Sequence, residues 1–144
     1  METFRVELTA PLDPGALHAY LEDLALHPEW RFDVTSSELA GGLTGGVGAR
    51  YDQRVGDDDR LVEAELTDSE RPAMVAFSVV DGRDRLDVEL VFEPEGPGCR
   101  IAMDVGRSST RRPWHRARRG APSAEELAVR YGRGLAERLG GALV

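Results

Sequence analysis

Hydrophobic and polar residues alternate along most of the first two thirds of the chain, and this period of two is typical of half-buried strands. Near the N-terminus, Phe4, Val6 and Leu8 share one face while charged residues take the other. Later segments with the same alternation, separated by Gly, Asp and Pro turn signals, are residues 33–39, 47–55, 61–67, 74–80, 86–92 and 100–105. Because short turns such as Asp81-Gly82 join them, we expect an antiparallel meander with one buried face.

After the first strand, the pattern changes to that of a helix. Asp13-Pro14 favours a helix start, with an N-cap residue followed by proline at the first helical position, and His27-Pro28 ends the helix. We expect His18, on this helix, to be exposed. Residues 28–32 are enough for one short helical turn that carries two aromatic side chains.

A second helical segment closes the chain. Ser123 and Glu126 have the spacing of a capping box, in which each residue satisfies a backbone donor of the other. Hydrophobic residues then follow at steps of four: Leu127, Tyr131, Leu135 and Leu139. Gly132 and Gly134 each weaken the helix by about 1 kcal/mol relative to Ala, but they also allow close packing. Residues 107–122, before this helix, show neither the hydrophobic period of a strand nor that of a helix.

The composition indicates a globular protein. Its 144 residues include 18 basic ones, all Arg, against 26 acidic ones, so the formal net charge is −8. At this length we expect one domain spanning residues 1–144. The acidic balance argues against general nucleic-acid binding. No apolar run has the roughly 20 residues that a membrane span needs.

Cysteine usage and the N-terminal sequence favour a cytoplasmic protein. Cys99 is the only cysteine, which excludes an internal disulfide and any paired-cysteine metal or redox motif. Residues 1–5 lack the basic start of a signal peptide. The histidines, His18, His27 and His115, do not have the spacing of a zinc site. We therefore expect neither a metal nor a cofactor.

Two short motifs, together with the order of predicted elements, resemble a known family. His27-Pro28-Glu29-Trp30 resembles the proline–tryptophan turn after the first helix of the SRPBCC (START-like) superfamily, in its polyketide cyclase/dehydrase and lipid-transport branch. Gly46-Val47-Gly48-Ala49-Arg50-Tyr51 is similar to the glycine-led start of that branch's third strand. The resemblance covers residues 3–106 and 123–144, and the connection 107–122 is longer than the family's usual one.

This resemblance implies an α+β helix-grip fold. In it, a curved antiparallel sheet of about seven strands wraps around a long C-terminal helix, and two short helices follow the first strand. It also implies a cavity between the sheet and that helix. We predict that the cavity binds a hydrophobic small molecule, either polyketide-like or lipid-like, because an apolar lining with aromatic walls is typical of such sites. A filled core is the alternative interpretation of the same face.

The predicted ligand-binding residues come from the inward face of the strands, the stripe of the last helix and the aromatic turn. They are His27, Trp30, Tyr51, Gln53, Phe77, Leu90, Phe92, Met103, Tyr131 and Leu135. Gln53 is distinctive because a buried amide must find hydrogen-bond partners.

An enzyme that uses the same cavity is an alternative, as a polyketide cyclase, aromatase or dehydratase. Proton transfer would need a group within hydrogen-bond reach of the substrate. The inward polar candidates are Glu38, Tyr51, Gln53, Ser78 and Tyr131. None forms a dyad recognisable from spacing, so the catalytic residues stay unassigned.

Residues 107–122 form a basic segment in an acidic chain. They contain six Arg and no acidic residue, a charge of +6 that leaves −14 for the rest. A solvated loop at the cavity mouth is the simpler interpretation. The sharper hypothesis makes the protein an interaction module, in which an acyl carrier protein or another anionic partner contacts Arg111, Arg112, Arg116 and Arg118. The sequence also leaves a homodimer open.

Overall fold

The structure, a computed structural model, describes residues 1–110 and 121–144 and has the predicted α+β architecture. Its helices are α1 (Pro14–Leu21), the 3₁₀ helix η1 (Leu24–Glu29) and α2 (Ala124–Leu139). Its strands are β1 (Glu2–Ala10), β2 (Val34–Gly41), β3 (Arg50–Val55), β4 (Arg60–Glu70), β5 (Met74–Asp81), β6 (Asp84–Glu95), β7 (Gly98–Ser109) and β8 (Ala142–Leu143).

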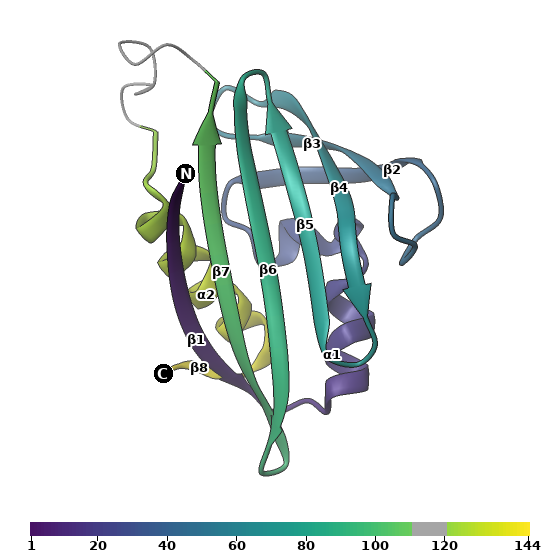
Figure 1. The fold of residues 1–144 in the computed structure, drawn as a ribbon, viewed down its shortest axis with the longest axis vertical. Coiled ribbons are helices and arrows are strands. Elements are labelled where there is room, and N and C mark those ends of the chain that lie inside the picture. Colours follow the sequence, from purple (N-terminus) through teal and green to yellow (C-terminus); the bar gives the residue numbers. More distant parts are fainter. Residues whose placement is uncertain (111–120) are drawn as a thin grey trace.

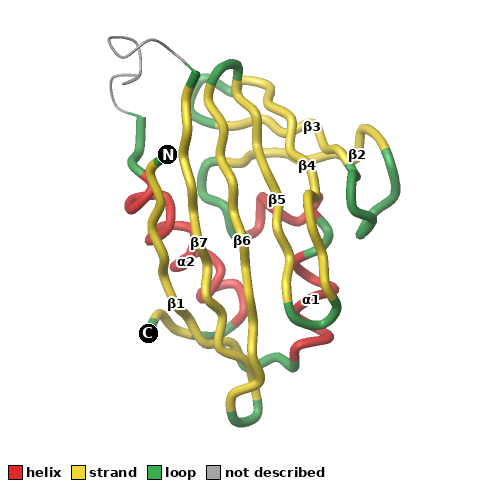
Figure 2. Tube along the Cα trace, in the orientation of Figure 1, coloured by secondary structure: helices red, strands yellow, loops and turns green. Residues whose placement is uncertain are grey.

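Within the described residues, eight strands form one antiparallel sheet in the order β2-β3-β4-β5-β6-β7-β1-β8. Strands β2 to β7 form the predicted meander. Figures 1 and 2 show a curved sheet with α2 and the two short helices on the same side of it. This arrangement confirms the predicted helix-grip fold. The strand beyond the predicted seven is β8, whose two residues pair with the end of β1.

The last strand of the meander is longer than its hydrophobic alternation predicts. Residues 107–109, assigned from the sequence to the connection, belong to β7 because their backbone pairs with β6, from Arg107 opposite Leu86 to Ser109 opposite Asp84. Backbone pairing does not require an apolar side chain, so the hydrophobic pattern stops before the strand does.

Side-chain caps start both α-helices where the sequence predicts. The Asp13 carboxylate accepts a hydrogen bond from the Ala16 backbone N–H at 3.0 Å, and Pro14 is the first residue of α1. The Ser123 hydroxyl accepts from the Glu126 N–H at 3.1 Å. Each contact satisfies a backbone donor that has no partner within its helix.

The hydrophobic core lies between the sheet and the helices. The stripe of α2 faces β1 and β7, and its Tyr131 and Leu135 have no exposed surface. Trp30, directly after η1, lies edge-on to Phe77 of β5, with 6.2 Å between the ring centroids. Cys99 is a buried free thiol. Among the described residues, no helix is both long and apolar enough to cross a membrane.

The expectation that His18 is exposed is wrong. Its side chain is buried, and its Nε2 lies 2.8 Å from the Ser69 hydroxyl at the end of β4. Its Nδ1 lies 3.2 Å from a carboxylate oxygen of Glu22, one helical turn further on. The ends of β4 and β5 cover this side of α1, a contact that the helix's own sequence does not reveal.

Candidate functional site

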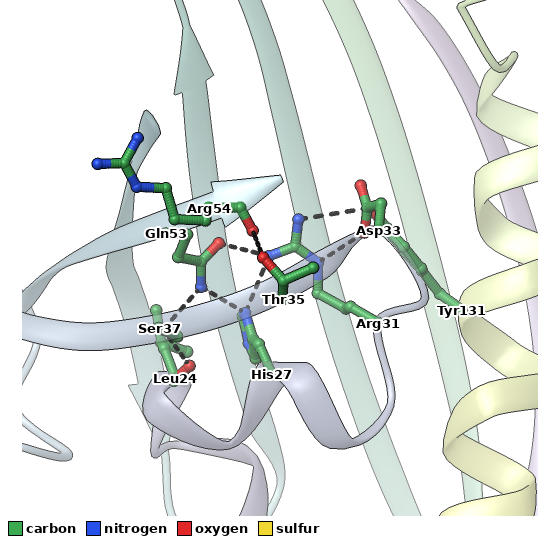
Figure 3. A network of polar contacts seen from close by, with 9 residues as sticks. All are labelled: Leu24, His27, Arg31, Asp33, Thr35, Ser37, Gln53, Arg54 and Tyr131. Carbon is green, nitrogen blue, oxygen red and sulfur yellow. Dashed lines mark hydrogen bonds and ion pairs between the residues drawn. The ribbon is translucent and has the colours of Figure 1, made fainter. Parts of the chain in front are cut away.

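A buried arginine lies at the centre of a polar network inside the fold (Figure 3). Arg31 follows η1, and its side chain is 1% exposed. Its Nη1 donates hydrogen bonds to Gln53 Oε1 at 2.8 Å and to His27 Nδ1 at 3.0 Å. Its Nη2 donates to the Tyr131 hydroxyl at 3.4 Å. The network therefore joins η1, β3 and α2.

The Gln53 amide finds the partners that its inward position requires. Besides accepting from Arg31, it donates from Nε2 to His27 Nδ1 at 3.0 Å and to the Ser37 hydroxyl at 3.1 Å. The Ser37 hydroxyl in turn donates to the Leu24 carbonyl at 2.8 Å. The buried amide is thus held by side chains from three segments, as buried polar groups generally require.

His27 is a neutral acceptor in this network. Its Nδ1 accepts from both Arg31 and Gln53, which places the ring proton on Nε2. Burial, and secondarily the positive charge of Arg31, lower the pKa of His27 well below its usual 6.5. The ring also packs against Phe77, tilted by 52° with 4.4 Å between the ring centroids.

Aromatic rings flank the buried guanidinium of Arg31. Its central carbon lies 5.5 Å from the ring centroid of Phe77 and 5.2 Å from that of Tyr131. A cation over an aromatic face is attracted by the ring quadrupole, most strongly where water is excluded. The rings therefore stabilise a charge that would otherwise be expensive to bury.

Asp33 supplies the opposite charge. Its Oδ1 lies 3.8 Å from Arg31 Nε, and its Oδ2 accepts a 2.8 Å hydrogen bond from the Tyr131 hydroxyl. Burial raises the pKa of Tyr131 far above its usual value, so this hydroxyl stays protonated and donates. Arg31, Asp33 and Tyr131 form one neutral, hydrogen-bonded group.

A cavity of about 110 Å³ lies against this group, between the sheet and the N-terminal half of α2. Its polar end is formed by Arg31, Asp33 and Tyr131. Its apolar walls are Val55, Val62, Val79, Leu86 and Leu127. The remaining lining residues are charged, Arg60, Asp81, Asp84, Arg85 and Arg107, or belong to the segment before α2, Ala121 and Pro122.

An outer groove of about 670 Å³ adjoins this inner cavity. Residues that line both are Asp33, Arg60, Ala121 and Pro122. Phe32, Glu126 and Arg130 are among the other residues of the groove, and the guanidinium of Arg130 lies 3.5 Å over the Phe32 ring. A ligand that enters the inner cavity can therefore extend into a wider, more polar groove.

The ten predicted ligand-binding residues are all buried, and the structure divides them into two groups. The polar network and its ring contacts bring together His27, Trp30, Gln53, Phe77 and Tyr131. The hydrophobic core contains the others, Tyr51, Leu90, Phe92, Met103 and Leu135. Tyr131 lines the inner cavity, and the other nine are not among its lining residues. Ligand contact at all ten residues stays a prediction.

Sequence reasoning missed the charged residues of the site. Arg31 and Asp33 lie in the short segment between η1 and β2, where a charge is ordinarily solvated. One signal was available: an inward amide at Gln53 needs a partner, and Arg31 follows the aromatic turn directly. Of the other inward polar candidates, Ser78 is buried as expected, whereas Glu38 is exposed on β2.

The predicted anion-binding residues Arg111, Arg112, Arg116 and Arg118 lie outside the described residues. Arg107, at the start of the same basic segment, is described. It pairs within β7, and its guanidinium donates a hydrogen bond to the Pro122 carbonyl at the cavity mouth.

Comparison with known proteins identifies the fold. No family model matches the chain, and no curated protein matches it. A START superfamily protein from Mycobacterium smegmatis superposes with a TM-score of 0.71 at 10% identity, over 96% of this chain and 94% of its own. Ara h 8.0201 superposes with a TM-score of 0.68 at 16% identity, over 96% of this chain and 94% of its own. Major latex-like protein 151 from Panax ginseng superposes with a TM-score of 0.68 at 12% identity, over 95% of this chain and 96% of its own. The chain therefore has the same fold as these proteins, the helix-grip fold that its element order predicts.

Proposed function

We propose that the protein binds a hydrophobic small molecule, polyketide-like or lipid-like, in the inner cavity between the sheet and α2. The observation that carries this proposal is the cavity's lining, in which five aliphatic side chains face a polar group formed by the buried Arg31 and Tyr131 and the half-buried Asp33. Small-molecule sites combine apolar walls with a few convergent polar groups in this way.

The size of the inner cavity limits how such a ligand binds. Ligand pockets commonly measure about 300–1,000 Å³, and a cavity of about 150 Å³ holds one benzene molecule. The inner cavity, at about 110 Å³, therefore accepts one end of a ligand, such as a short alkyl chain or a small ring. The outer groove offers about 670 Å³ for the remainder.

A pair of neighbouring valines allows a direct test. Val79 lines the cavity, whereas Val80, the next residue of β5, is 44% exposed on the opposite face of the sheet. Val79→Phe fills the cavity, and Val80→Phe adds the same group outside it. Native mass spectrometry of protein purified from its own host should show a bound small molecule in the wild type and in Val80→Phe. The Val79→Phe variant should lack this molecule. Repeated absence of any bound species from the wild type would contradict the proposal.

A cyclase, aromatase or dehydratase that uses the same cavity is a second candidate, favoured by the Asp33–Tyr131 pair in the cavity wall. The Asp33 carboxylate, held in place by the Tyr131 hydroxyl, can accept a proton from the attacking carbon of a substrate.

Heptane-2,4,6-trione is a suitable probe for this candidate, because its intramolecular aldol reaction with loss of one water gives orcinol. Catalysis should raise the rate of orcinol formation in the wild type and in Asp104→Asn, and not in Asp33→Asn. Asp104 is the control because it pairs with Arg5 on the outer face of the sheet. A wild-type rate equal to that of buffer would contradict cyclisation of this substrate class.

Delivery of the ligand by an acyl carrier protein is a third candidate, supported by the basic composition of residues 107–122. Reversing Arg111, Arg112, Arg116 and Arg118 to Glu should abolish binding of a purified acyl carrier protein. Binding to the wild type should weaken as the salt concentration rises. Unchanged affinity in the reversed variant would contradict this partner.

A further inference from the structure

The polar end of the inner cavity contains one hydrogen-bond donor and one acceptor that are not used within the described residues. Arg31 Nε and Asp33 Oδ1 are buried atoms that make no hydrogen bond there. They lie 3.8 Å apart, an ion-pair distance that is too long for a direct hydrogen bond. Nearly all buried polar atoms in native proteins have a partner. This donor and acceptor therefore define a place for a polar group from a ligand.

The arrangement selects between the polar groups that a ligand can carry. A hydroxyl can accept from Arg31 Nε and donate to Asp33 Oδ1 at the same time. A carboxylate only accepts, and it would face the Asp33 carboxylate. An ammonium group only donates, and it would face the Arg31 guanidinium. A neutral hydroxyl is the group that uses both protein atoms without like-charge repulsion.

Two of the three arginines at the rim of the cavity are paired with carboxylates. Arg60 pairs with Asp58 and with Asp81, with both nitrogen–oxygen distances at 2.7 Å. Arg85 pairs with Asp87 at 3.0 Å. Arg107 donates to the Pro122 carbonyl.

We propose that the buried end of the ligand carries a neutral hydroxyl, as an alcohol, phenol or enol, and that Arg31 Nε and Asp33 Oδ1 bind it. This inference rests on the proposed ligand-binding function and specifies the chemical class of the ligand.

Three probes with the same ring test this preference: phenol, toluene and benzoate, titrated at pH 7 and followed by NMR chemical shifts. Phenol should bind at least about tenfold more tightly than either of the others, the effect expected of a hydrogen bond to a charged group. Equal affinities for phenol and toluene, or tighter binding of benzoate, would overturn the hydroxyl preference and leave cavity binding intact. Failure of all three to bind would overturn both.

Asp33→Asn gives a reciprocal test. This change leaves the positive charge of Arg31 uncompensated, so benzoate should gain at least about tenfold in affinity relative to phenol. The control is Asp104→Asn, which also removes a carboxylate paired with an arginine but lies on the outer face of the sheet. It should keep the wild-type order of the three probes. If Asp33→Asn bound the three probes in the same order of affinity as the wild type, the assignment of a hydroxyl to the Arg31–Asp33 site would be overturned.

Discussion

The Tyr131 hydroxyl donates a 2.8 Å hydrogen bond to Asp33 Oδ2, which ties the middle of α2 to the segment that precedes β2. The same hydroxyl accepts from Arg31, so it lies between the two charged groups. Because all three residues also line the inner cavity, contacts that hold the helix against the sheet form the polar end of the proposed site. Stability and ligand binding should therefore change together at these positions.

Tyr131→Phe is expected to lower the free energy of unfolding by about 1–3 kcal/mol, because Asp33 Oδ2 and Arg31 Nη2 both lose their hydrogen bond to the buried hydroxyl. Urea denaturation measures the loss. Tyr20→Phe is the matched control, since the Tyr20 hydroxyl bonds to Glu29 at 2.9 Å on the exposed side of the fold. The Tyr20→Phe variant should lose less than about 1 kcal/mol of unfolding free energy. Equal losses in the two variants would show that the buried hydroxyl has no special role.

Arg31→Met should be more damaging, at about 3–5 kcal/mol, because it removes the charge that compensates the half-buried Asp33 and leaves the buried Gln53 Oε1 without its donor. Adding Asp33→Asn should recover part of the loss, since the uncompensated carboxylate is then gone. The four proteins of this double-mutant cycle, compared by urea denaturation, give the coupling energy. Strictly additive effects would argue against an ion pair between Arg31 and Asp33.

The sequence predicts the elements of this fold better than it predicts the site. Period-two alternation locates the strands, and side-chain caps at Asp13 and Ser123 locate both helix starts, because these signals are local. The two-residue strand β8 has no such signal, since it depends on where the chain lies after α2.

The site depends on contacts between distant segments, and only part of it could be predicted. The inward position of Gln53 follows from strand alternation, and so does its need for a partner. That the partner is Arg31 could not be predicted, because a charged residue in a connecting segment is ordinarily solvated. His18 is a similar case, since its burial depends on the end of β4.

His27 should make the protein less stable in mild acid. Its pKa is lowered in the folded state, so below its unfolded value of about 6.5 the unfolded chain binds an extra proton. The free energy of unfolding should then fall as the pH falls, by up to about 1.4 kcal/mol per pH unit from this group.

His27→Asn keeps an acceptor that does not titrate, so this variant should lose less stability than the wild type between pH 7 and pH 5. Urea denaturation at several pH values checks this. His18→Asn is the comparison, because burial also lowers the pKa of His18 and its own, separate contribution should disappear in that variant. An identical pH dependence in His27→Asn and the wild type would contradict a neutral His27 in the network.

Substitution by alanine should affect stability differently at two glycines of α2. A Cβ at Gly134 would lie 2.2 Å from the Trp30 carbonyl oxygen, a backbone atom that cannot rotate away. A Cβ at Gly132 would lie 3.0 Å from Leu143 Cδ2 and 3.1 Å from Val6 Cγ2, which are side-chain ends that can shift. Helix propensity alone favours alanine by about 1 kcal/mol at both positions.

Gly134→Ala is therefore expected to destabilise the protein by about 1–3 kcal/mol through overpacking, in spite of its better helix propensity. Gly132→Ala should change stability by less than about 1 kcal/mol. The midpoints of urea unfolding for the two variants provide the comparison, because the substitutions are chemically identical and lie two residues apart. A Gly134→Ala protein as stable as the wild type would contradict this close approach of α2 to Trp30.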